Sequence, residues 1–101
     1  MEKIKVNVTH NRHTGNYYVT CNGGRYNLCF FQKSKVSDDG WYFRDNLTRS
    51  VRFISCRPGE TFPLEFLTNL IKSSWFFEFG VKDFPEIEFT KAAQKLLKIQ
   101  Q

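Results

Sequence analysis

The hydrophobic pattern of this chain changes its period near residue 58. Before that point apolar and polar residues alternate, as at Ile4, Val6 and Val8, and a period of two is typical of a half-buried strand. After Pro58-Gly59, which interrupts strands, apolar residues recur every three or four positions, and this spacing favours helices. A chain with strands first and helices second is predicted to form an α+β domain.

The strand-like half predicts an antiparallel meander of about five strands. Residues 10–15 are polar and end in glycine, so they indicate a turn. Asn22-Gly23 is the strongest hairpin signal, because a type I′ turn needs positive φ at both central residues. The expected strands cover residues 4–9, 16–21, 25–31, 41–44 and 49–56.

The second half predicts one or two helices that cover one face of this sheet. The first helix is expected to begin near Pro63, which suits the first turn of a helix. The second is expected to open at 83–86, where a cap residue, a proline and an acid stand together. Residues 75–77 are ambiguous and either end the first helix or form a further strand. The apolar stripes are Leu64, Leu67 and Ile71, then Phe89, Ala93 and Leu96.

Length and composition set the broad class. A chain of 101 residues is expected to be a single domain, 1–101, with a basic β-rich half, 1–57, and a helical half, 58–101. No apolar run approaches the ~18 residues of a membrane span, and no signal-peptide pattern is visible. Three cysteines without a C-x-x-C pair are typical of reduced thiols. We expect a soluble, cytoplasmic protein that does not contact membranes.

Basic residues are concentrated in the β-rich half. Residues 1–57 hold ten of the fifteen Lys and Arg but four of the ten Asp and Glu. Aromatic residues make up 17% of the chain and are interleaved with these bases. A basic sheet with exposed aromatics is one way to bind single-stranded nucleic acid, because bases stack on rings while cations neutralise phosphates.

Simple alternation places Tyr18, Phe31 and Tyr42 on the face opposite the larger apolar set. If helices cover one face only, these rings lie exposed among bases. In the alternative, the strand aromatics fill the core and leave a solvated basic face; these are Tyr17, Tyr26, Phe30, Phe43 and Phe53. The predicted nucleic-acid-binding residues are Arg25, Lys33, Lys35, Tyr42, Arg44, Arg49 and Arg52.

A second candidate surface is the aromatic cluster Trp75, Phe76, Phe77 and Phe79. Exposed Trp and Phe are enriched in protein interfaces. This cluster predicts either a homodimer or docking on another protein. The alternative function is a small regulator or inhibitor, of the kind that phages and mobile elements encode, that docks on a host complex or an acidic protein surface.

Catalytic and metal-binding patterns are weak. His10 and His13 near Cys21 lack a second ligand pair at zinc-finger spacing, and Asp38-Asp39 in a polar segment is more typical of a solvated turn than of an acid–base pair. No nucleophile pattern singles out one of the cysteines. We therefore expect a protein that is not an enzyme and that uses no metal or other cofactor.

Overall fold

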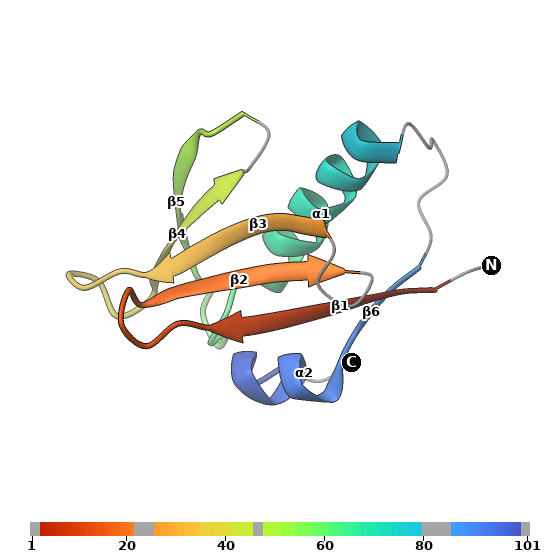
Figure 1. The fold of residues 1–101 in the computed structure, drawn as a ribbon. Helices are drawn as coiled ribbons and strands as arrows, with labels where there is room; N and C mark the ends of the chain where they lie inside the picture. Colours follow the sequence, from red (N-terminus) through yellow and green to blue (C-terminus); the bar gives the residue numbers. More distant parts are fainter. Residues whose placement is uncertain (1–2, 22–25, 46–47, 80–85, 100–101) are drawn as a thin grey trace.

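The computed structural model describes residues 3–21, 26–45, 48–79 and 86–99. In these residues the chain forms six strands and two helices (Figure 1). The strands are β1 (Lys3–His10), β2 (Asn16–Cys21), β3 (Tyr26–Lys33), β4 (Gly40–Asp45), β5 (Val51–Ser55) and β6 (Glu86–Phe89), and the helices are α1 (Leu64–Phe79) and α2 (Lys91–Leu97). The α+β class is confirmed, but the predicted number of strands is wrong by one.

The strands form one sheet in the order β5-β4-β3-β2-β1-β6. The first five make the predicted antiparallel meander, and β6 adds to β1 in parallel. The second predicted helix does not include Glu86–Phe89, which forms β6, because Ile87 and Phe89 face the core with a period of two. The rest of its predicted start, 83–85, lies outside the described residues. The helix starts after Thr90, whose hydroxyl oxygen accepts the N–H of Ala93.

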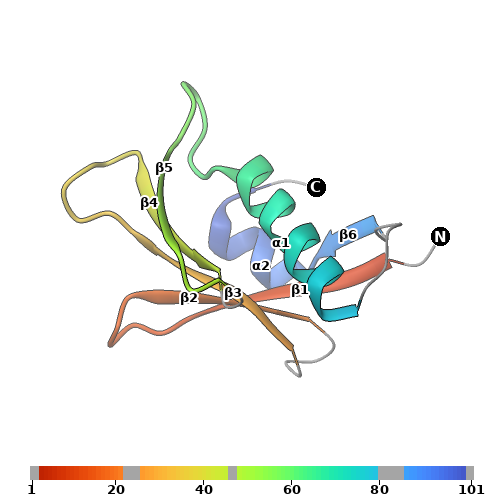
Figure 2. The same cartoon turned by 90° about the horizontal axis from the view of Figure 1, so that it is seen from above.

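Both helices lie on the same side of the sheet, and the sheet curls toward them at β4 and β5 (Figures 1 and 2). Helix α1 packs on β3 and α2 packs on β1. The prediction that helices cover one face is therefore confirmed. Neither described helix is long and apolar enough to cross a membrane.

The core lies between the helices and the concave face of the sheet. Its centre is Phe31 of β3, whose ring lies 5.6 Å from that of Trp41 and 5.1 Å from that of Phe43. Leu67 and Ile71 of α1 are fully buried, as their helical spacing predicts. Such burial stabilises by roughly 1.5–3 kcal/mol per large apolar side chain.

A bulge in β3 overturns the predicted faces of Phe30 and Phe31. Val19 of β2 pairs with Cys29, whereas the next residue, Thr20, pairs with Asn27, so one residue of β3 is extra. Simple alternation fails across such a bulge. Phe31 is therefore buried and Phe30 faces away from the helices, the reverse of the expectation.

The turn before β2 is confirmed. The Asn11 side chain accepts the N–H groups of His13 and Thr14, and Gly15 adopts a φ of +79°, which favours glycine. The predicted hairpin at Asn22-Gly23 lies outside the described residues. The ambiguity at residues 75–77 is settled as helix, since α1 continues to Phe79.

Candidate nucleic-acid interface

The face of the sheet turned away from both helices, here called the outer face, carries a group of aromatic residues. Successive side chains of a strand point to opposite faces of the sheet. Four aromatic rings and one guanidinium of β2 to β5 therefore lie on the outer face, because they alternate with residues that face the helices. Tyr42 and Phe53 are 40% and 45% exposed, and the other two aromatic residues are half-buried. The group consists of Tyr18, Phe30, Tyr42, Arg44 and Phe53.

The four rings form two pairs. Tyr18 and Phe30 have ring centroids 5.8 Å apart on β2 and β3. Tyr42 and Phe53 have centroids 5.1 Å apart on β4 and β5. Both separations lie within the usual range for interacting aromatic side chains. The two pairs therefore occupy adjoining parts of one uncovered surface.

Arg44 lies over one ring of the first pair, Phe30, and on the same strand as Tyr42 of the second pair. It stands opposite Phe30 in the β3–β4 register, and its guanidinium carbon lies 5.4 Å from the centroid of that ring. The contact orders the Arg44 side chain by a cation–π interaction of about 0.5–1 kcal/mol at an exposed site. A cation is thus held beside two groups of partly exposed rings.

The charges of the outer face are unevenly placed. Arg44 lies at the aromatic end, whereas Glu86 and Glu88 alternate with buried residues of β6 at the far edge. Lys5 of β1 stands opposite Glu88 in the register. An anionic strand would therefore be favoured near β4 and β5 and disfavoured near β6.

The predicted basic residues do not gather on one face. Tyr42 and Arg44 lie on the outer face, but Arg52 and Lys33 alternate to the helix side, where they lie over the rings of Phe66 and Trp41. Lys35 and Arg49 are exposed in the segments between strands. Arg25 lies outside the described residues. Of the predicted residues that the structure describes, the outer face therefore carries Tyr42 and Arg44.

Two outer-face rings were placed in the core set by the sequence pattern. The alternating pattern places Phe30 on the wrong face because it does not predict the bulge in β3. Phe53 was misplaced because β5 is an edge strand whose apolar side faces outward, and its polar residue Arg52 faces α1. The sequence does contain one indication of the outward position of Phe53. Gly40 on β4 has no side chain, so a ring from the next strand can lie over it.

The aromatic cluster of α1 is divided between core and surface. Trp75 is half-buried and packs against the core, whereas Phe76 is 42% exposed. The side chains of Phe77 and Phe79 lie outside the described residues. The described part of the cluster therefore offers one exposed ring and no broad patch.

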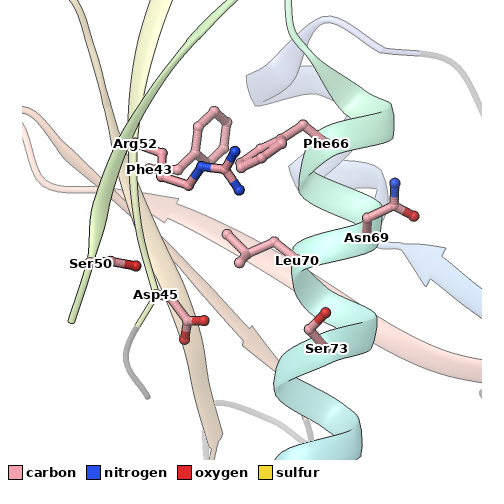
Figure 3. Close-up of a pocket in the computed structure, with 8 residues that line it drawn as sticks. All are labelled: Phe43, Asp45, Ser50, Arg52, Phe66, Asn69, Leu70 and Ser73. Atoms are coloured by element: carbon pink, nitrogen blue, oxygen red, sulfur yellow. The ribbon is translucent and has the colours of Figure 1, made fainter. Parts of the chain in front are cut away.

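A groove runs between β5 and α1 on the helix side of the sheet (Figure 3). Its first hollow has a volume of 160 Å³, and Arg52 extends into it toward Phe66. A second hollow of 260 Å³ continues past Ile54 and Pro63, and the two share Phe66 and Asn69. This groove is open to a ligand that approaches along the edge of the sheet.

The histidines and cysteines show no catalytic arrangement among the residues described. The ring of His10 stacks on Tyr17 with centroids 4.0 Å apart, and no group of three His, Cys, Asp or Glu is placed to hold a metal in this part of the chain. Burial raises the pKa of the Cys29 thiol to about 12, and the charge of Asp45 adds to the shift. Burial also raises the pKa of Cys56, although the Trp41 indole opposes this. Such thiols are poor nucleophiles at neutral pH.

Comparison with known proteins identifies no relative: no family model, no curated protein and no solved structure matches the chain.

Proposed function

We propose that this protein binds single-stranded DNA or RNA on the outer face of its sheet, as a non-enzymatic accessory or regulatory protein. One observation carries the proposal. The ring pairs Tyr18–Phe30 and Tyr42–Phe53 lie with Arg44 on a face of the sheet that no described helix covers. Flat rings offer stacking surfaces to bases, and each stacked base contributes ~1–3 kcal/mol.

The spacing of the rings suits an unpaired strand. The two pairs stand on β2–β3 and β4–β5, roughly 10 Å apart at the usual strand spacing. Bases of a single strand can separate and lie on both pairs, whereas bases of a duplex are already stacked on one another. Arg44 is placed to neutralise the phosphate between two such bases, and Lys35 and Arg49 can extend the path.

The test is fluorescence anisotropy with short single-stranded and duplex oligonucleotides at two salt concentrations. We expect micromolar or tighter binding to the single strands, weaker binding to the duplex, and a steep loss of affinity with salt as counterions are released. Absence of binding at low salt would overturn the proposal, as would affinity that is insensitive to salt. Recovery of a protein partner after nuclease treatment at ~0.5 M salt, where surface charges are largely screened, would favour the protein-docking alternative if oligonucleotides also fail to bind.

A further inference from the structure

The edge of the sheet at β5 carries backbone groups without partners in the described chain. The N–H of Asp45 donates to the carbonyl of Ser50, and the N–H of Cys56 donates to the carbonyl of Asp39. In an antiparallel ladder the bonded residues alternate. Residues 52 and 54 therefore bond to β4, and the N–H and C=O groups of Val51, Phe53 and Ser55 point away from the sheet.

The groove between β5 and α1 lies beside this edge (Figure 3). A strand added to β5 would send every second side chain to the helix side, and successive side chains on that side stand about 6.8 Å apart. The hollows of 160 and 260 Å³ follow one another along β5 and share Phe66 and Asn69. They can therefore take two side chains of one extended segment.

The charge of Arg52 determines which side chain the added segment must carry opposite it. Its guanidinium carbon lies 5.6 Å from the ring centroid of Phe66, and it forms no ion pair with a carboxylate in the described part of the chain. An inward-facing charge on an edge strand disfavours pairing with most strands, because pairing would desolvate it. A segment that brings a carboxylate to this position removes that penalty, so Arg52 discriminates among partners.

We propose that β5 accepts an extended segment of a partner protein as a further strand, with a single Glu or Asp of that segment paired to Arg52. The other positions of the segment are uncharged, because Asp45, Glu60 and Glu65 also line the groove. Main-chain hydrogen bonds to Val51, Phe53 and Ser55 supply affinity, and the groove supplies selectivity. The proposal does not depend on nucleic-acid binding, because Arg52 and the groove lie on the opposite side of the sheet from Arg44.

The test is a titration followed by amide NMR. The probe is a synthetic peptide of alternating threonine and valine with one central glutamate, compared with the same peptide carrying lysine at that place. We expect shifts along β5 and slower hydrogen exchange at the amides of Val51, Phe53 and Ser55. The glutamate peptide should bind about tenfold more tightly than the lysine peptide, as a close charge pair at an interface allows.

Two controls separate strand addition from simple charge attraction. N-methylation of the peptide amides that face β5 should abolish binding, whereas N-methylation of the amides on the other edge should preserve it. Arg52→Glu should reverse the preference, so that the lysine peptide binds more tightly, and Arg52→Gln should bind both peptides alike. The amide spectrum of each variant checks its fold.

Several results would overturn the proposal. These are the absence of shifts at millimolar peptide, equal effects of the two N-methylated peptides, and an unchanged charge preference in Arg52→Glu. Loss of oligonucleotide binding in Arg52→Gln, without change in peptide binding, would assign the groove to nucleic acid instead. If oligonucleotides do not bind, the peptide titration can still succeed. The nucleic-acid proposal and the strand-addition proposal can therefore be overturned independently.

Discussion

The ring of Phe53 lies over Gly40 of the neighbouring strand. A Cβ built on Gly40 would overlap the Cζ and Cε2 atoms of Phe53. Gly40 stands diagonally across from Phe53, whose direct partner in the register is Tyr42. The missing side chain therefore lets the Phe53 ring lie on the sheet beside Tyr42, where both rings are open to solvent.

This relationship predicts that Gly40→Ala weakens oligonucleotide binding without unfolding the protein. The new methyl group displaces the end of a flexible, exposed side chain, and alanine in a strand is otherwise favoured over glycine by roughly 0.5–1 kcal/mol. Loss of one stacking position should lower affinity about fivefold or more, measured by anisotropy.

The effect of Gly40→Ala should depend on Phe53. In a Phe53→Ala background the same change should cost no further affinity, because the ring it displaces is absent. Additive losses in the double variant would show that Gly40 acts by another route.

Arg44 and Arg52 form a matched pair for mapping the nucleic-acid surface. They stand on adjacent strands but face opposite sides of the sheet. Arg44→Ala should weaken binding to all oligonucleotides and reduce the slope of log affinity against log salt by about 0.7, the value for one phosphate on a single strand. Arg52→Ala should leave that slope unchanged. Equal effects of the two variants would contradict the placement of the interface on the outer face.

The α+β class can be predicted from the sequence because the hydrophobic period of each segment depends only on residues close together in the chain. The alternation of Ile4, Val6 and Val8 matches their burial, and the helical spacing of Leu67 and Ile71 matches theirs. Each pattern reflects one element packed on one core, so period alone predicts it. The same argument predicts that helices cover a single face, since the strand segments alternate in polarity.

The errors arise where pairing over long distances decides the outcome. The four residues of β6 are too short a run to indicate a strand, and they gain their place by pairing with β1 at the other end of the chain. The bulge that turns Phe30 outward depends on the β2–β3 register. The outward face of Phe53 depends on β5 being an edge. Local alternation thus predicts the outward positions of Tyr18, Tyr42 and Arg44, but not those of Phe30 and Phe53.

The pKa of Cys29 predicts a loss of stability in alkali. The folded thiol titrates near 12, whereas its ordinary value is 9.0. Above pH 9 the unfolded chain releases a proton that the folded chain retains, so the free energy of unfolding falls as pH rises from 9 toward 12. The contribution of this group is at most about 1.4 kcal/mol per pH unit.

Urea denaturation at several pH values between 7 and 11 measures this contribution. Cys29→Ala should lower stability at pH 7 through lost packing, but its profile should fall less steeply above pH 9 than that of the unchanged protein. Parallel profiles would show that the Cys29 thiol does not contribute to the alkaline loss.

Thr90 joins the C-terminal helix to the first strand. Its hydroxyl accepts the N–H of Ala93 at 3.1 Å and donates to the Asn7 side chain at 2.7 Å, and its own N–H donates to the carbonyl of Val6 at 3.0 Å. Thr90→Val keeps the shape and the backbone bond but removes both hydroxyl bonds. We expect a loss of about 1–2 kcal/mol in the free energy of unfolding, whereas Thr90→Ser should stay within about 0.5 kcal/mol.

Urea denaturation of the two Thr90 variants tests this, and the Asn7 bond can be separated from the cap. In a Thr90→Val background, Asn7→Ala should cost less than it does in the unchanged protein, because the donor to Asn7 is already gone. Oligonucleotide affinity under native conditions should be the same in all these variants, since Asn7 and Thr90 stand at the β1–β6 edge of the sheet, whereas the aromatic pairs stand on β2 to β5. Equal stability of the Val and Ser variants would show that the hydroxyl bonds contribute nothing. Weakened oligonucleotide binding in a folded Thr90 variant would place the interface nearer to β1 than the aromatic pairs indicate.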